Sequence, residues 1–422
     1  MNWLLPLVLL LSLSGCGGGY VAATSGARAE FYSGQFDEAA KKLEQSAHTE
    51  GKDQLLYLLD RATALHQASL FEESNKDFLL ADKIAEISDY TSISKEVSSL
   101  VVTEEIGHYK GDEYEYVLIS QYLALNFLML GKTEDALVES RRVNQKLYRL
   151  VNEGKRKYNL NPMAMYLVAL LYENSGEWED SYIDYQGVRK LHATLPYLRE
   201  DLYRLAWRTK NHEDMSKWVD EFGLSSEEQK KIRDTAGDPE VVFIIENGRA
   251  PQKEPNPQWQ AIPKFYSKYN PTDFVQITAK NETGEQIAEA RSFDMYDVEK
   301  VANQNMDEKY GPLLAKKIAG LVVKGVIAAE IGKNTDPGLG YLVFQALNAM
   351  DSADTRSWLT LPKSFQIARV RLPRAGGSFT VKIQPLTASN SSSGAASTVI
   401  EKIIHVEAGK PRQRFFVPVR IY

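Results

Sequence analysis

The N-terminal half of the chain repeats one pattern of hydrophobic and polar positions, which reads as helix, tight turn, helix. Five turn segments align with one another, and each carries Asp or Glu at its fourth and fifth positions. They are Gly34–Ala39, Ser69–Ser74, Gly131–Ala136, Gly176–Ser181 and the weaker Lys210–Met215. Acidic residues at the start of a helix oppose its dipole and stabilise it. The pattern therefore predicts a series of helical hairpins.

Small residues recur at two positions around the first four turns, where the backbones of packed helices would come closest. Alanine stands seven residues before each turn, and alanine or serine stands five residues after its first residue. These positions are Ala27, Ala62, Ala124 and Ala169 before the turns, and Ala39, Ser74, Ala136 and Ser181 after them. Turn-to-turn spacings of 35, 62, 45 and 34 residues include two at the tetratricopeptide period. We expect a tetratricopeptide-like repeat domain over 24–237, with an irregular helical bundle without a groove as the alternative.

From residue 238 the pattern changes to that of strands. Val241–Ile245 is a β-branched and aromatic run bounded by turn residues, which predicts a buried strand. Later segments alternate apolar and polar residues, and a hairpin is expected across Asn281–Gly284. The further predicted strands are 274–279, 286–293, 365–372, 379–383, 399–406 and 414–421. The pattern predicts an α+β multidomain chain in which 238–422 is an antiparallel β-sandwich-like domain.

A helical insertion interrupts the strands over 296–350. Within it, 312–331 is an apolar helix with interspersed lysines, and 341–350 is expected to form a return helix. Two interpretations stay open for 312–331. The first is a basic amphipathic helix that contacts lipid or a partner. The second is a helix that packs against the sheet and exposes its lysines to water. The proline-rich 251–271 is expected to be a loop packed on the sheet, and Ser389–Ser397 a Ser/Ala-rich loop.

Cys16, the only cysteine, follows a short apolar stretch at the N-terminus and closes the run Leu13–Cys16. This run resembles the lipobox of bacterial lipoproteins, which implies a signal peptide over 1–15 and a lipidated tether over 16–23. A transmembrane anchor is the alternative, but it needs about 20 apolar residues, more than this stretch offers. The residue after the cysteine is glycine rather than aspartate, which resembles the signal that sorts lipoproteins to the outer membrane. The resemblance implies a chain anchored in the outer membrane by lipid and facing the periplasm.

Composition and isolated motifs give little support for chemistry. The net charge of −6 disfavours nucleic acid, and a single cysteine leaves no disulfide framework or Cys-ligated zinc. The six histidines lack metal-site spacing, and Ser92 with Lys95 fits a serine-enzyme spacing that is common by chance. Asp294, Asp297 and Glu299 are candidates for paired carboxylates, but at a strand-to-helix transition we interpret them as caps of the helix that follows. We therefore expect no enzyme, no metal, no cofactor and no small-molecule substrate.

Several strings resemble an uncharacterised family of Gram-negative lipoproteins that join tetratricopeptide-like repeats to a C-terminal β-domain. They are residues 109–115, 136–144 and 356–362, the last followed shortly by residues 368–370, which also match. The family carries no established activity. In cell location and domain organisation, its members resemble proteins found beside the activators of cell-wall synthases. This resemblance implies partners in the cell envelope.

Repeat proteins bind partners along a concave face, and the first helix of each hairpin lines that face. Counting back from the turns selects the expected partner-binding residues, with two more on the same faces. They are His66, Gln67, Glu173, Asn174, Trp207 and Arg208, together with Tyr166 and Arg204. For each, a solvated helix face is the alternative, and for Trp207 a core position. The leading hypothesis is a non-catalytic, lipid-anchored periplasmic scaffold that binds envelope proteins. The alternatives are a regulator of peptidoglycan synthases, and an envelope transport or secretion component or a hydrolase.

Overall fold

The computed structural model describes most of the chain, and packing divides it into two compact units. The described residues are 19–95, 107–152, 160–334, 336, 338–339, 341–342, 353–387, 399–410 and 413–422. Unit 1 is Met1–Ile119, Pro251–Lys268 and Lys300–Thr360, and unit 2 is Ser120–Ala250, Tyr269–Glu299 and Leu361–Tyr422. Both units combine helices from the N-terminal half with later segments. The packing therefore does not divide the chain at the expected boundary between 237 and 238.

Three predicted segments lie wholly or mostly outside the described residues. They are the signal peptide with Cys16, the Ser389–Ser397 loop and the return helix over 341–350.

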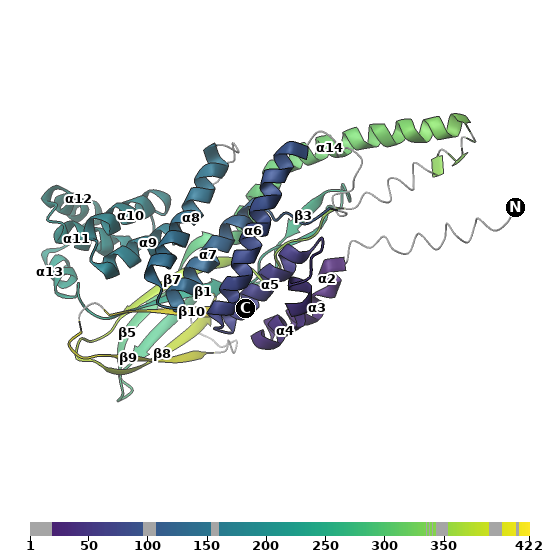
Figure 1. Cartoon of the computed structure of the whole chain (residues 1–422). Helices are drawn as coiled ribbons and strands as arrows, with labels where there is room; N and C mark the ends of the chain where they lie inside the picture. Colours follow the sequence, from purple (N-terminus) through teal and green to yellow (C-terminus); the bar gives the residue numbers. More distant parts are fainter. Residues whose placement is uncertain are drawn as a thin grey trace. The chain divides into compact units, whose positions relative to one another are not determined.

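Helices make up the N-terminal half, as predicted (Figure 1). In unit 1 they are α2 (Gly19–Ala23), α3 (Ser25–Tyr32), α4 (Phe36–Ala47), α5 (Gln54–Gln67) and α6 (Phe71–Lys95). Helix α7 (Glu113–Met129) begins in unit 1 and ends in unit 2. In unit 2 they are α8 (Thr133–Asn152), α9 (Pro162–Ser175), α10 (Trp178–Leu191), α11 (Tyr197–Arg208), α12 (His212–Phe222) and α13 (Ser226–Asp234).

All five predicted turns are present, and their first residues share one backbone conformation. The φ angles are 83° at Gly34, 63° at Ser69, 70° at Gly131, 84° at Gly176 and 56° at Lys210. In each turn the next backbone N–H donates to the carbonyl five residues earlier, for example Glu177 to Tyr172 at 2.9 Å. This is the Schellman ending of a helix. The alignment of the turns is confirmed even where glycine is absent.

The small-residue positions are buried as the hairpin alignment requires. All eight side chains are at most 5% exposed. In two hairpins the serine makes the same bond, from Ser74 Oγ to the Ala62 carbonyl at 2.7 Å and from Ser181 Oγ to the Ala169 carbonyl at 2.8 Å. An equivalent serine therefore ties the second helix to the first. Tetratricopeptide-like hairpins and the mixed helix and sheet composition are confirmed.

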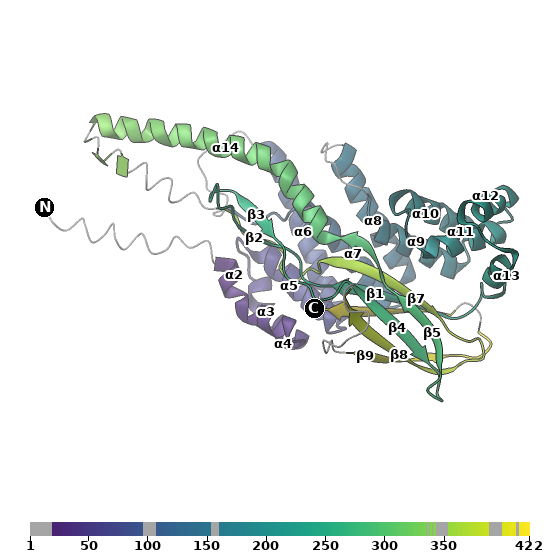
Figure 2. The same ribbon diagram turned by 180° about the vertical axis from the view of Figure 1, so that it is seen from behind.

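Unit 2 holds two four-stranded sheets, which Figure 2 shows from behind. One has the order β10-β1-β7-β6 and the other β5-β4-β8-β9. Their strands are β1 (Glu240–Asn247), β4 (Phe274–Lys280), β5 (Gln286–Arg291), β6 (Phe293–Asp297), β7 (Ser364–Arg371), β8 (Gly377–Leu386), β9 (Ile400–Val406) and β10 (Arg414–Ile421). The predicted strands and the hairpin at Asn281–Gly284 are therefore confirmed.

The two sheets share one hydrophobic core. Val241, Phe243 and Ile245 of β1 contribute one face of it, and Val275 and Ile277 of β4 face them from the other sheet. Since every residue of β1 is buried, its other face is covered as well. The prediction of a purely antiparallel sheet is wrong at one edge, because β10 pairs with β1 in parallel. The chain's last strand returns beside the first one of the β segment.

Two segments of unit 1 differ from their predictions. Within 251–271, β2 (Gln252–Pro255) and β3 (Pro263–Tyr266) form a two-stranded sheet of their own rather than a loop on the larger sheets. Helix α14 (Val298–Asn334) begins earlier and runs further than the predicted 312–331. Within the described ranges, no helix combines the length and apolar character needed to cross a membrane.

Candidate functional site

The first-helix faces of unit 2, where partner binding was expected, are filled by strands of the same chain. Helices α9 and α11 carry Glu173, Asp201 and Arg204 on the faces that meet β1, β7 and β10. Tyr197 at the start of α11 adds a backbone contact, because its hydroxyl accepts the Arg369 N–H at 3.0 Å. The strands therefore occupy the position expected for a partner.

Six charged side chains close a ring at this interface. Three arginines alternate with three carboxylates, and each arginine contacts two carboxylates. Arg204 binds Glu173 and Asp201, both at 2.8 Å. Arg369 binds Asp201 and Glu240, both at 2.7 Å. Arg414 completes the ring, with Glu240 at 3.0 Å and Glu173 at 3.2 Å.

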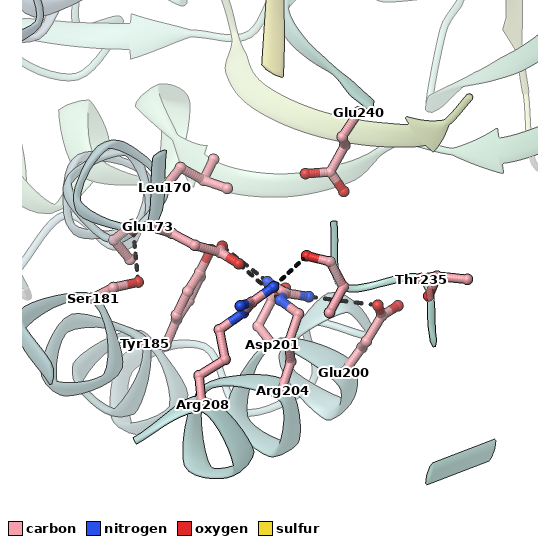
Figure 3. A network of polar contacts seen from close by, with 12 residues as sticks. Leu170, Glu173, Ser181, Tyr185, Glu200, Asp201, Arg204, Arg208, Thr235 and Glu240 are labelled. Carbon is pink, nitrogen blue, oxygen red and sulfur yellow. Dashed lines mark hydrogen bonds and ion pairs between the residues drawn. The ribbon is translucent and has the colours of Figure 1, made fainter. Parts of the chain in front are cut away.

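The ring is buried, and its charges hold one another ionised. Burial by itself would raise the pKa of Glu173, but the charges of Arg204 and Arg414 hold it well below its usual range. Burial by itself would also raise the pKa of Glu240, but the charges of Arg369 and Arg414 lower it to about 2. Two tyrosines complete the contacts, from Tyr166 to Asp201 at 2.7 Å and from Tyr185 to Glu173 at 3.0 Å. Figure 3 shows Arg204, Glu173 and Asp201 converging below Glu240.

These contacts correct three of the predicted partner-binding residues. Tyr166, Glu173 and Arg204 are 0%, 5% and 2% exposed. A partner cannot reach them while α9 and α11 hold the strands. These three side chains lie on the faces of α9 and α11 that the strands cover.

The hollow beside the ring is too small for a substrate. It is lined by Glu173, Asn174, Glu240 and Arg414 among others, and its volume is about 20 Å³. A space of that size holds about one water molecule. The ring is therefore a polar core between helices and sheet, with no room for a reacting molecule.

In unit 1 the first-helix faces hold an extended segment, residues 353–360, which we call the strap. Its centre is Trp358, which is 1% exposed and whose ring lies 5.7 Å from that of Phe78 in α6. The indole N–H donates to Thr63 Oγ1 of α5 at 3.0 Å. At the strap's end, Tyr32 of α3 donates to the Leu359 carbonyl at 2.6 Å. The strap lies on the helices as a bound peptide would.

Buried carboxylates hold the backbone of the strap. The N–H of Trp358 donates to Glu115 Oε1 at 2.7 Å, and the N–H of Thr360 donates to Asp60 Oδ1 at 3.2 Å. Arg356 pairs with Asp53 at 2.7 Å, at the start of α5. These bonds recognise main chain as well as side chains, which is how a groove binds an extended segment.

Glu115 and its neighbour Asp112 lie in opposite electrostatic surroundings. Burial raises the pKa of Glu115 to about 7, and the charge of Asp112 adds to this shift. Burial alone would also raise the pKa of Asp112, but Lys253 and Lys309 hold it well below its usual range. The two lysines lie 2.6 Å and 3.0 Å from its carboxylate. Asp112 is therefore the more acidic member of the pair.

The other predicted partner-binding residues are placed differently. His66 is buried against Phe71, with ring centroids 5.6 Å apart. Gln67, Trp207 and Arg208 are half-buried, and Asn174 is exposed. A partner can therefore reach the last four at least in part.

Trp207 and Arg208 form a cluster with Trp178, the aromatic residue of the turn that begins at Gly176. The Arg208 guanidinium lies 4.6 Å from the centre of the Trp178 ring and 5.5 Å from that of Trp207. Arg208 also donates to the Ala236 carbonyl at 2.9 Å. We call Trp178, Trp207 and Arg208 the tryptophan cluster. All three side chains are half-buried.

The candidate chemical residues do not come together into a site. Among the described residues, no three His, Cys, Asp or Glu side chains are grouped so that they could hold a metal ion. Asp294 is part of strand β6 and accepts from Ser364 and Gln366 at 2.8 and 2.9 Å, which corrects its assignment as a helix cap. Ser92 and Lys95 lie in α6, whose side chains are not described there.

Reasoning from the sequence missed the strap and most of the ring. One signal was available in the strands. Glu240 directly precedes the strand predicted to be buried, and Arg369 lies within the predicted strand 365–372. A buried charge needs a partner of opposite sign. The pattern could therefore have indicated an ion pair, but it could not name Asp201, which lies 168 residues from Arg369 in the chain.

No protein-family model and no curated protein matches this chain. Solved structures of repeat proteins are similar to about half of it. Nearly identical TPR-like repeats from Podosopora anserina are 13% identical and cover 52% of this chain and 98% of their own, with a TM-score of 0.33. A tetratricopeptide repeat protein from Parabacteroides merdae is 14% identical over 51% of this chain and 70% of its own, also at 0.33. MamA from Desulfovibrio magneticus is 14% identical, covering 50% and 94%, at 0.31. Because these TM-scores are low, the assignment of helical hairpins rests on the turns and contacts of this chain itself.

Proposed function

We propose that the chain is a non-catalytic scaffold, anchored by lipid at Cys16 and facing the periplasm, that binds envelope proteins through its repeat helices. The tryptophan cluster is the observation that carries this proposal. Tryptophan and arginine are the residue types that most often dominate protein interfaces. Here they stand half-buried at the ends of α9–α11 hairpins, with the exposed Asn174 close in sequence to Trp178.

The filled inner faces support a scaffold with rigid units rather than an open groove. In unit 2 the ring joins α9 and α11 to the sheet, and in unit 1 the strap covers α3 and α5. Binding then falls to surfaces at the turns.

Capture of envelope proteins tests the binding site. The full-length Cys16→Ser chain, attached to beads, is expected to retain a defined set of proteins from a solubilised bacterial envelope. Combined Trp207→Ala and Arg208→Ala changes should weaken that capture at least about tenfold, because truncation of an interface hot spot costs about 2 kcal/mol or more. Trp259→Ala is the matched control, since Trp259 is 41% exposed in unit 1.

Equal capture by the double variant and by the control would overturn the assignment of the cluster. Recovery of a cell-wall synthase among the retained proteins would select regulation of such enzymes as the role of the scaffold.

The anchor is tested separately, because lipid can join the chain only at the Cys16 sulfur. Labelling of cells with a clickable fatty acid should mark the unaltered chain and leave the Cys16→Ser variant unmarked. Label that persists on the serine variant would contradict the lipoprotein assignment.

A further inference from the structure

An open cavity in unit 1 lies where helix α4 ends and helix α5 begins. Its volume is about 320 Å³, and its lining consists of residues 45–46, 49–54 and 57. All of these residues belong to one compact unit of the chain. Sites for small ligands begin at about 300 Å³. The cavity can therefore admit a small ligand, whereas the hollow of about 20 Å³ beside the ring cannot.

The loop between the two helices forms part of the lining, and main-chain bonds hold it in place. The Tyr109 N–H donates to the Lys52 carbonyl at 2.7 Å, and the Gln54 N–H donates to the Gly51 carbonyl at 3.3 Å. Groups that are already ordered lose less conformational entropy when a ligand binds. The loop is therefore preorganised for binding.

Three side chains of the lining are each fixed by a contact and still keep a free polar atom. Asp53 binds Arg356 through Oδ1 at 2.7 Å, and the Gln54 amide donates to the last carbonyl of α4 at 3.2 Å. The Tyr57 ring packs edge to face with that of Tyr20, with the centroids 5.3 Å apart. In the described part of the chain, Asp53 Oδ2, Gln54 Oε1 and the Tyr57 hydroxyl make no hydrogen bond. These three atoms are available to a ligand.

The charges of the lining favour a neutral ligand. Glu50 and Lys52 carry opposite charges two residues apart in the loop, and Asp53 is already paired with Arg356. An anion or a cation would therefore meet a charge of its own sign as well as one of the opposite sign. The remaining polar side chains of the lining are neutral amides and hydroxyls, which both donate and accept hydrogen bonds. They are Gln45, Ser46, Thr49, Gln54 and Tyr57.

We propose that this cavity binds a neutral mono- or disaccharide. The hydroxyls of a sugar donate and accept hydrogen bonds, which match the amides and hydroxyls of the lining. The C–H face of a sugar ring is apolar and packs on an aromatic side chain, and Tyr57 is the aromatic residue of the lining. Such a ligand was not expected from the sequence. The proposal uses neither Cys16 nor the tryptophan cluster, so failure of the proposed function leaves it unchanged.

Isothermal titration calorimetry on the full-length Cys16→Ser chain tests this inference. The probes are N,N′-diacetylchitobiose, maltose and cellobiose, and the charged references are choline, glycine and inorganic phosphate. At least one saccharide should bind, with a dissociation constant at least about tenfold lower than that of any charged reference, a difference that one or two well-made hydrogen bonds supply.

Combined Gln54→Leu and Tyr57→Leu changes should weaken saccharide binding at least about tenfold, because they remove two free polar atoms and the aromatic ring. Gln258→Leu is the matched control, because Gln258 is an exposed glutamine of unit 1 outside the cavity. It should bind the saccharide as the parent chain does. Circular dichroism should give all the proteins the same helix content.

A second pair of changes tests the cavity from the side of α4 and leaves the packing of Tyr57 on Tyr20 intact. Combined Gln45→Leu and Ser46→Ala changes should weaken saccharide binding at least about fivefold, because they remove an amide and a hydroxyl. Three results would each overturn the inference. They are no saccharide binding by the parent chain, tighter binding of a charged reference, and equal saccharide binding by the second pair and the control.

Discussion

Single charged residues determine how the helices of unit 2 hold the sheet. Arg369 is the most connected of them, because it bridges Asp201 of α11 and Glu240 of β1, both at 2.7 Å. Each carboxylate keeps one other arginine, Arg204 or Arg414. Removing Arg369 therefore leaves two buried negative charges with half their compensation.

We expect Arg369→Leu to lower the free energy of unfolding by about 3–5 kcal/mol, the usual loss when one partner of a buried pair is removed. Urea denaturation measures the change. Arg374→Leu is the control, because Arg374 pairs with Asp238 with its side chain 56% exposed, and its loss should cost at most about 1 kcal/mol. Equal losses in the two variants would contradict a structural role for the ring.

Glu115 should make stability depend on pH in a defined direction. Its pKa is raised to about 7 in the folded chain, from its ordinary value of 4.5. The folded state then binds more protons than the unfolded state between these values. The contribution of Glu115 to the free energy of unfolding is therefore fully present below about pH 4.5. It is lost as the pH rises through 7, a loss of up to about 3 kcal/mol.

Glu115→Gln should flatten this dependence, because the amide imitates the protonated acid and does not titrate. Urea midpoints at pH 5 and pH 8 test the prediction, with the parent chain as reference. Asp112 does not blur the window, because its lowered pKa moves its own contribution to more acidic solution. A slope that survives the glutamine change would assign the effect to other groups, among them Asp184, whose pKa burial raises to about 6.

At the scale of elements, the strap acts as the ligand of its own repeats. Trp358 provides its main apolar contact, and main-chain bonds to Glu115 and Asp60 hold it on either side. The strap has no helix or strand of its own over 353–358. Its order therefore depends on these contacts, together with those of Arg356 and Leu359.

We expect Trp358→Ala to loosen the strap and to destabilise unit 1 by about 3–5 kcal/mol, the usual cost of deleting a buried Trp side chain. Hydrogen exchange at the Trp358 and Thr360 amides should become much faster. Trp259→Ala, at an exposed tryptophan in the same unit, should leave both amides protected. Unchanged protection after Trp358→Ala would show that the carboxylates hold the strap without the indole.

At the scale of the molecule, repeat helices and strands lie together in unit 2. Each compact unit draws on both halves of the chain. In unit 2 the inner face of α9 and α11 is completed by β1, β7 and β10. The helical half taken alone would expose this face, with Glu173 and Asp201 left without two of their arginines.

A fragment of residues 20–237 should therefore not fold into a stable domain, although repeat hairpins contact mainly their neighbours. Circular dichroism should show reduced helix and a broad thermal transition compared with the full chain. The full chain is the reference, because it contains the strands that supply the other residues of the ring. A sharp transition of the fragment near that of the full chain would contradict this dependence.

The sequence by itself determined the local structure of this protein. The five turns, the small positions of the hairpins and nearly all strands were predictable, because each depends on residues close together in the chain. Local sequence indicates a turn residue with positive φ, a serine that bonds a carbonyl twelve residues earlier, and a strand with alternating burial. The inner faces of the repeats were predictable in the same way.

Only the tertiary structure decided what covers those faces. The partners of Asp201 and Glu115 lie 168 and 243 residues away in the chain, at Arg369 and Trp358. No local pattern relates such positions, and a polar residue on a helix face is read as solvated unless its partner is known. The parallel return of β10 beside β1 is decided in the same way. Burial of both faces of β1 then forces the charges at this interface to pair with one another, because an unpaired charge has no place in a dry interior.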